Sequence, residues 1–219
     1  MELLISLRQN TLGISIFAIV TAGLIALTQV STKEQIIENE RAQQAKALYE
    51  IIPADSIDND LLHYQIDIQA PMLGYAHAKA YQAMQKGQVT AVILPVITPD
   101  GYSGDISLIV GINADASVAG VRVLSHKETP GLGDKVDLRK SDWILSFNQT
   151  RMQGSDDQRW AVKKDGGQFD QFTGATITPR AIVIAVSRAL QFFQNNRSIL
   201  LSPSPSPSTP SSMPDKEAS

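Results

Sequence analysis

The sequence of 219 residues contains no cysteine and only three histidines, His63, His77 and His126. The absence of cysteine excludes disulfide bonds, iron–sulfur ligation by thiolates and cysteine-type zinc sites. No two histidines have a metal-binding spacing such as i, i+4, which favours solvated or core positions for His63 and His77. Any redox chemistry must therefore use a bound organic cofactor, a haem or metal ligands other than cysteine.

The chain also lacks a cluster of basic residues, and its formal net charge is -3. A nucleic-acid partner would need a clustered basic face, so we expect no nucleic-acid binding. Hydrophobic residues at 43% and charged residues at 19% are values typical of globular proteins. The length allows one ordinary domain with appendages.

No charged residue occurs between Arg8 and Lys33. Residues 11–30 (TLGISIFAIVTAGLIALTQV) would form a helix of about 30 Å, enough to cross a bilayer core. A cleaved signal peptide is the alternative, but the apolar run exceeds a usual signal core and no clear cleavage site follows. We expect an uncleaved anchor with residues 1–10 in the cytoplasm and the large domain outside the membrane, although the flanking charges do not decide the orientation.

Two further segments flank the expected domain, residues 53–198. Residues 31–52 contain good helix formers and end before Pro53; they form either a stalk or the first helix of the domain. Residues 199–219 are rich in proline and serine and have few apolar side chains, so we predict a disordered tail. A partner-binding tail is the alternative.

The pattern between these flanks is mostly that of short strands. Strands are expected at residues 64–68, 89–98, 105–112, 118–124 and, less clearly, 160–162. A short helix is expected near residues 138–147, and a clear amphipathic helix begins at Pro179. This mixture predicts an α+β domain with a mainly antiparallel sheet and flanking helices.

The stretch DGGQFDQFTGATITPR, residues 165–180, holds the candidate site. Thr178 followed by Pro179 is a good helix start, with a hydroxyl at the N-cap and proline at the first helical position. Free N–H groups at such an end favour a phosphate, which Arg180, Lys163 and Lys164 would help to hold. The residues alone therefore predict a phosphate-bearing ligand near Thr176, although a purely structural capped helix gives the same pattern.

Asp170, Thr173, Gly174, Ala175 and Thr176 fit the flavinylation motif D-x-x-[ST]-G-A-T. The segment resembles that of FMN-binding domain proteins. The resemblance implies that a dedicated flavin transferase takes FMN from FAD and joins it through its phosphate to Thr176. The ring would then remain free for electron transfer.

Two other blocks resemble the same family: DGYSG from Asp100, and HKETPGLG from His126. Beside a flavin, Gly131 would allow close approach, and Thr129 and Leu132 would pack on the ring. A direct cofactor role for His126 or Glu128 is an open alternative to a capping one. Trp143 and Trp160 are interpreted as core residues.

The order of these blocks behind an anchor helix is similar to that in the G-type subunits of Rnf (Rsx) ion-translocating electron transport complexes, over roughly residues 1–195. The resemblance implies a periplasmic flavoprotein subunit in the inner membrane, relaying electrons between partner subunits in a complex linked to NADH and ferredoxin. The alternatives are a C-type subunit of a sodium-translocating NADH:quinone oxidoreductase and a non-redox, membrane-tethered assembly module.

Overall fold

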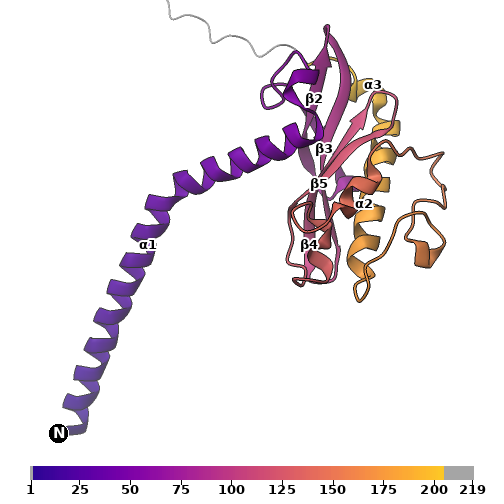
Figure 1. Cartoon of the computed structure of the whole chain (residues 1–219). Coiled ribbons are helices and arrows are strands. Elements are labelled where there is room, and N and C mark those ends of the chain that lie inside the picture. Colours follow the sequence, from indigo (N-terminus) through magenta and orange to yellow (C-terminus); the bar gives the residue numbers. More distant parts are fainter. Residues whose placement is uncertain (1, 205–219) are drawn as a thin grey trace, which may run out of the picture. The chain divides into compact units, whose positions relative to one another are not determined.

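The computed structural model describes residues 2–204, beginning with the long helix α1 (Glu2–Ile51; Figure 1). The chain divides after Gln44 into two units. In the first unit, Gly13–Lys33 is long and apolar enough to cross a membrane, a property that signal sequences share. Its large apolar side chains are exposed, as those of a lipid-facing anchor would be. The predicted span at residues 11–30 overlaps this segment.

The second unit is built on a five-stranded sheet with strands in chain order. Every neighbouring pair is antiparallel, so the predicted antiparallel α+β architecture is confirmed. The strands are β1 (Gln65–Gln69), β2 (His77–Gln85), β3 (Gln88–Gly101), β4 (Gly104–Asn113) and β5 (Val118–Ser125). Sequence reasoning missed β2, whose letters HAKAYQAMQ contain alanine, glutamine and lysine in place of the β-branched residues typical of strands.

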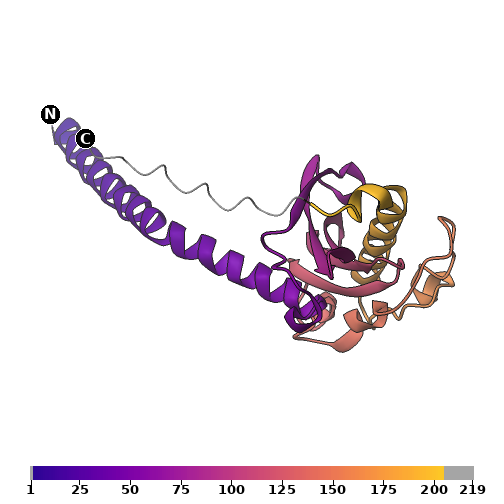
Figure 2. The same cartoon turned by 90° about the horizontal axis from the view of Figure 1, so that it is seen from above.

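Both faces of the sheet are covered, which explains the continuous apolar run of β3. Val92, Leu94 and Val96 pack into the core shared with helix α2 (Ile177–Asn195). The alternate residues Ala91 and Ile93 face the opposite core, which contains the end of α1. Figure 2 shows α2 and the last turns of α1 on opposite sides of the sheet. Period-two alternation thus buries both faces of one strand.

The last turns of α1 are seated directly on the sheet. Leu48 and Ile51 are buried there. Ile51 lies over Gly111 and Gly120, which are cross-strand partners on β4 and β5. A Cβ atom at Gly111 would lie 2.3 Å from the Ile51 Cγ2 atom. From Ala45 onward α1 therefore belongs to the domain unit, whereas the stalk interpretation fits only the residues before it.

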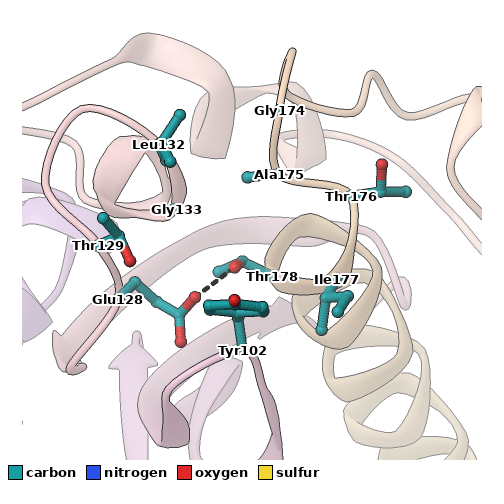
Figure 3. A pocket seen from close by; sticks show the side chains of 10 residues that line it. All are labelled: Tyr102, Glu128, Thr129, Leu132, Gly133, Gly174, Ala175, Thr176, Ile177 and Thr178. Atoms are coloured by element: carbon teal, nitrogen blue, oxygen red, sulfur yellow. Dashed lines mark hydrogen bonds between the residues drawn. The ribbon is translucent and has the colours of Figure 1, made fainter.

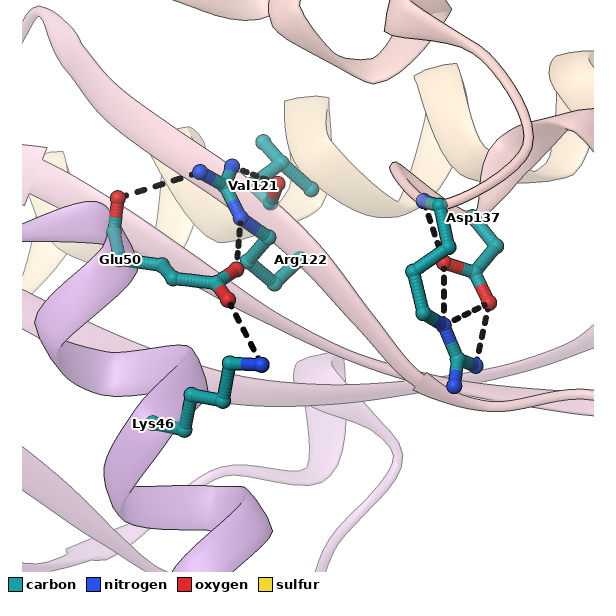
Figure 4. Close-up of polar contacts among 6 residues, drawn as sticks. Lys46, Glu50, Val121, Arg122 and Asp137 are labelled. Atoms are coloured by element: carbon teal, nitrogen blue, oxygen red, sulfur yellow. Dashed lines mark hydrogen bonds and ion pairs between the residues drawn. The ribbon is translucent and has the colours of Figure 1, made fainter.

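A polar contact fixes the same joint. Arg122 on β5 donates from Nε to the Glu50 carboxylate at 2.9 Å and from Nη2 to the Glu50 carbonyl at 3.1 Å (Figure 4). A guanidinium at a helix C-terminus satisfies a carbonyl that has no partner within the helix. Lys46 lies 4.0 Å from the other Glu50 oxygen and is mostly exposed. The end of α1 is thus held by apolar packing and by one charged donor.

The connecting segments contain short helical turns in place of longer elements. These are η1 (Ala54–Ser56), η2 (Pro71–Leu73), η3 (Gly133–Val136), η4 (Asp142–Phe147), η5 (Lys163–Asp165) and the short helix α3 (Arg197–Leu200). The helix expected at residues 138–147 is confined to the 3-10 turn η4, which starts after the Ser141 cap. Residues 160–162 form no strand, since only a single bridge links Val162 to Phe169. The loop is held instead by an aromatic cluster in which Trp160 is buried, which confirms its predicted core position.

The predicted tail begins too early in the sequence. Leu200 is fully buried, and the buried Gln82 side chain donates to the carbonyls of Leu200 and Ser202 at 2.8 and 2.7 Å. The side-chain oxygen of Gln82, Oε1, accepts from the Ser204 N–H at 2.9 Å. Residues 199–204 are therefore held on the domain by a long-range contact that composition does not reveal. The rest of the predicted tail, residues 205–219, lies outside the described residues.

Candidate flavin site at the start of helix α2

Helix α2 begins earlier than the sequence suggested. Its first residue is Ile177 and Thr176 occupies the N-cap, so the prediction of Thr178 as the N-cap was wrong. The Thr178 hydroxyl is occupied by a tertiary contact instead, because it is buried and donates to the carboxylate of Glu128. Pro179 is then the third residue of the helix. Its missing N–H breaks no helical hydrogen bond, because the first N–H groups of a helix have no partner within it.

A pocket of about 230 Å³ opens beside this helix end (Figure 3). It joins three segments that are distant in the sequence: the β3–β4 turn, the loop before η3 and the loop before α2. Its lining combines apolar side chains with hydroxyl groups and one carboxylate, as in many ligand sites. The lining residues are Tyr102, Glu128, Thr129, Leu132, Gly133, Gly174, Ala175, Thr176, Ile177 and Thr178.

Glu128 connects the three segments. One carboxylate oxygen accepts from Ser103 N–H at 3.0 Å and the other accepts from the Thr178 hydroxyl. The Glu128 N–H in turn donates to His126 Nδ1 at 3.1 Å. His126 therefore makes a local contact of the capping kind, and Glu128 lines the pocket; a direct cofactor role for either residue stays a prediction.

Besides Thr129, which is an exposed lining residue, three threonines near the start of α2 differ in accessibility. Thr178 is fully buried and hydrogen-bonded. Thr173 is exposed but does not line the pocket. Thr176 lines the pocket and is only partly buried, and it makes no side-chain capping hydrogen bond to the helix. Of the three threonines at the start of α2, Thr176 is therefore the one that lines the pocket without being fully buried, and its side chain points away from those of Leu132 and Tyr102 (Figure 3).

The basic residues expected around a phosphate are mostly paired elsewhere. Arg180 donates to both oxygens of Asp165, at 2.6 and 2.9 Å. This contact lowers the pKa of Asp165 below its ordinary value and raises that of Arg180. Lys163 pairs with Asp170 at 2.6 Å. The sequence analysis assigned these cations to a phosphate, whereas the structure pairs Arg180 in the first turn of α2 with Asp165 in η5, and Lys163 in η5 with Asp170.

The predicted site residues divide into two groups. Thr129, Leu132, Gly174, Ala175 and Thr176 meet at the pocket. The pocket lining does not include the other three predicted residues, Asp170, Thr173 and Gly131. Two of them make contacts elsewhere. The Gly131 N–H donates to Asp134 Oδ1 at 2.7 Å with φ +79°, which is a turn role. Asp170 is exposed, and its carbonyl accepts from Trp143 Nε1 at 2.7 Å.

Five lining residues were not among the predicted site residues: Tyr102, Glu128, Gly133, Ile177 and Thr178; of these, only Glu128 had a possible cofactor role in the sequence analysis. Tyr102 and Ile177 are among the exposed large hydrophobic residues, a property that a sequence pattern does not show. Gly133 had a detectable signal, because it ends the block HKETPGLG. A Cβ atom there would lie 2.7 Å from Glu128 Oε2 and 2.9 Å from Thr178 Oγ1, so glycine is required for those groups to meet.

Comparison with known proteins shows which family the chain belongs to. Residues 101–191 match the model of the FMN-binding domain, and residues 1–51 match that of the RnfG N-terminal region. The chain is 49% identical over 200 residues to the G-type subunit of the ion-translocating oxidoreductase complex of Vibrio atlanticus, covering 90% of this chain and 96% of the relative. The chain belongs to the RnfG family of ion-translocating oxidoreductase complex subunits.

Other relatives give the same result. The corresponding RnfG-family subunits of Pseudomonas aeruginosa strain PAO1 and Vibrio cholerae strain N16961 are 49% and 47% identical, over 90% and 89% of this chain and 94% of each relative. Membership of this family confirms the resemblance to the G-type subunits. It also favours a G-type subunit over the C-type subunit and the non-redox module that the sequence left open.

The residues at the pocket fit an FMN group. The FMN-binding domain match spans all the lining residues, from Tyr102 to Thr178. Apolar side chains such as Tyr102, Leu132 and Ile177 suit a flat aromatic ring, and the hydroxyl of Thr176 lies at the helix end that favours a phosphate. Among the described residues, no group of three or more histidine, aspartate or glutamate side chains is placed to hold a metal ion.

Proposed function

We propose that this protein is a membrane-anchored flavoprotein subunit whose FMN is joined to Thr176 through a phosphoester bond. The observation that carries the proposal is the position of Thr176 at the N-cap of α2: the residue lines the pocket, is not fully buried, and its side chain makes no capping hydrogen bond. In attachment, the Thr176 oxygen would form a bond to the FMN phosphorus of FAD. The pyrophosphate bond would break, AMP would leave and the hydroxyl proton would be lost.

The local structure supports this position in two ways. Thr176 makes no side-chain cap bond, so esterification breaks no contact that holds α2. The free N–H groups of the first turn of α2 also favour the negative charge of the phosphodiester that remains. Gly174, at φ +85°, gives the preceding loop a conformation that other residues rarely adopt.

Asp170 is proposed to serve attachment and not the pocket. Its side chain is exposed and reaches Lys163, on the surface that an attaching enzyme would meet. We expect Asp170→Ala to reduce flavin loading while the thermal unfolding midpoint changes little. Flavin loading equal to that of the original chain would contradict this role.

The proposed role of the protein is electron relay within a larger complex. FMN supplies one- and two-electron chemistry when bound, and the chain's own residues hold it beside the apolar side chains of Tyr102, Leu132 and Ile177. The relatives are subunits of an ion-translocating oxidoreductase complex, so the proposed partners are the other subunits of such a complex. The flavin transferase is a partner in maturation only.

The proposed location is the inner membrane, with the domain on the periplasmic side. The segment Gly13–Lys33 supports anchoring, and the short N-terminal flank is proposed to remain in the cytoplasm. A reporter enzyme that is active only outside the cytoplasm, fused after Ser219 so that the contacts of residues 199–204 are kept, should be active. A stable but inactive fusion would reverse the orientation.

Flavin attachment is tested by coexpressing the full chain with a flavin transferase and viewing the denatured protein on a gel under ultraviolet light. The original chain should fluoresce and Thr176→Ala should be dark. Gln171→Ala is the matched control, because Gln171 is exposed in the same loop, lies outside the pocket lining and occupies a motif position that accepts any residue; it should keep its fluorescence. A dark original chain would overturn covalent attachment, and fluorescence in Thr176→Ala would overturn the residue assignment.

A further inference from the structure

Glu128 is a buried carboxylate within the pocket lining. No ion pair joins it to a lysine, arginine or histidine in the part of the chain that the structure describes. A buried carboxylate needs compensation for the water it loses. Here two neutral hydrogen-bond donors provide that compensation. Because they carry no positive charge, they do not neutralise the negative charge of the Glu128 carboxylate.

Those donors come from two separate segments. Ser103 N–H donates to Oε1 at 3.0 Å, and the Thr178 hydroxyl donates to Oε2. Thr178 lies in the first turn of α2, where the helix dipole also favours a negative group. Helix α2 has no acidic residue of its own in that turn, so Glu128 supplies the charge from another segment.

Two glycines make room for the carboxylate. A Cβ atom at Gly133 would lie 2.7 Å from Glu128 Oε2, and one at Gly101 would lie 2.9 Å from Glu128 Oε1. Real Cβ atoms essentially never approach other atoms under 3.0 Å, so both positions require glycine or a movement of the carboxylate. The DGYSG and HKETPGLG blocks therefore both contribute to the seat of this one group.

We propose that Glu128 places a fixed negative charge in the pocket wall and thereby lowers the reduction potential of the bound FMN. The proposal rests on the proposed function, namely that FMN is bound in this pocket. An electron added to the flavin ring without a proton adds negative charge, and a nearby carboxylate opposes that addition. Because the carboxylate is buried, salt screens it less than a surface charge.

Asp134 offers a matched control. Its carboxylate is also buried and accepts a backbone N–H of the same loop, that of Gly131, but it does not line the pocket. Glu128→Gln and Asp134→Asn each replace one buried carboxylate by an amide of nearly the same shape. A general effect of lost charge or loosened loop would appear in both variants, whereas a local field in the pocket would appear mainly in the first.

The experiment is a spectroscopic redox titration of the full, flavin-loaded chain in detergent. Glu128→Gln should shift the midpoint potential in the positive direction, Glu128→Asp should stay nearer the original value, and Asp134→Asn should shift it less. An unchanged potential in Glu128→Gln, or an equal shift in Asp134→Asn, would overturn the proposal. So would a folded Glu128→Gln chain that accepts no flavin, since that would give the group a role in attachment.

A second variant covers the case in which Glu128→Gln does not fold. Thr129 is an exposed residue of the pocket lining, and Thr129→Lys would bring a positive charge next to Glu128 without removing its two donors. We expect a positive shift of the potential, and no shift would contradict a charge-set potential. If the original chain takes up no flavin, the proposed function fails; if it loads normally and the potentials do not change, only the role of Glu128 fails.

Discussion

The seat of α1 on the sheet is tested by placing one methyl group beneath Ile51. In Gly111→Ala the new Cβ atom would lie 2.3 Å from Ile51 Cγ2, whereas carbon atoms in contact lie about 3.5–4.0 Å apart. Ile51 is the last residue of α1, and its side chain is buried against β4. Either the end of α1 or the strand must therefore move by about 1 Å or more to relieve the contact. The variant overpacks a rigid joint.

Two effects set the size of the change. Overpacking a core by a methyl group costs about 1–3 kcal/mol. Replacing glycine by alanine also restricts the unfolded chain, which stabilises the fold by about 0.4–1 kcal/mol where the backbone allows it. We therefore expect Gly111→Ala to reduce the free energy of unfolding by about 1–2 kcal/mol, or about 2–8 °C in Tm for a domain of this size.

Gly120→Ala is the matched control across the same strand pair. Its new Cβ atom would lie 3.3 Å from Ile51 Cγ2, a tight contact that a small adjustment relieves, so its stability should change by less than about 0.5 kcal/mol. The double variant Ile51→Ala/Gly111→Ala removes the clashing methyl and should be more stable than the sum of the single changes predicts.

The assay is thermal and chemical unfolding of the full chain in detergent, followed by tryptophan fluorescence. Both tryptophans of the sequence, Trp143 and Trp160, lie in the domain, so the signal reports the domain and not the anchor. Equal stabilities of Gly111→Ala and Gly120→Ala, or strict additivity in the double variant, would refute the argument that the Ile51 side chain packs tightly on Gly111.

Three further changes test other parts of the fold. Arg122→Ala removes both donors to Glu50 at the end of α1 and should lower the free energy of unfolding by about 1–3 kcal/mol. Arg139 holds the pKa of Asp137 below its ordinary value of 3.8 by hydrogen bonding to it. A depressed pKa contributes stability that is present above the unfolded value and lost as the pH falls through the folded one. Acid unfolding below about pH 4 should therefore be less steep in Asp137→Asn than in the original chain. Phe147 is fully buried and stacks on a second aromatic ring at 4.4 Å, so Phe147→Ala should cost about 3–5 kcal/mol in denaturant unfolding.

Each of these has an outcome that contradicts it. Arg122→Ala should be compared with Lys46→Ala, whose 4.0 Å pair is mostly exposed and should contribute little; equal effects would show that the donors to Glu50 do not hold the helix end. If the free energy of unfolding falls with decreasing pH equally steeply in Asp137→Asn and in the original chain, Asp137 does not contribute to acid unfolding. A Phe147→Ala loss below about 1 kcal/mol would mean that the aromatic cluster collapses to fill the cavity.

The sequence predicted the parts of this protein that depend on neighbouring residues. Alternating apolar residues, a β-branched apolar run and a turn signal predicted four of the strands, and the long uncharged apolar run predicted the candidate anchor. The block from Asp170 to Thr176 located the loop that carries the candidate hydroxyl. Such patterns are local, because side-chain direction in a strand or helix follows from backbone geometry over a few residues. The missed strand β2 lacks that pattern, and only pairing with β1 and β3 makes it a strand.

Only the tertiary structure decided how those parts form a site. The Glu128–Thr178 contact spans 50 positions along the chain and occupies the hydroxyl that the sequence analysis assigned to the N-cap; Thr176 stands at the N-cap instead. The contact also separates a buried threonine from one that is not fully buried. Such contacts depend on sheet register, on two glycines that leave room for a carboxylate, and on the packing of three loops. No local pattern in the sequence encodes that combination, although the sequence supplies every residue in it.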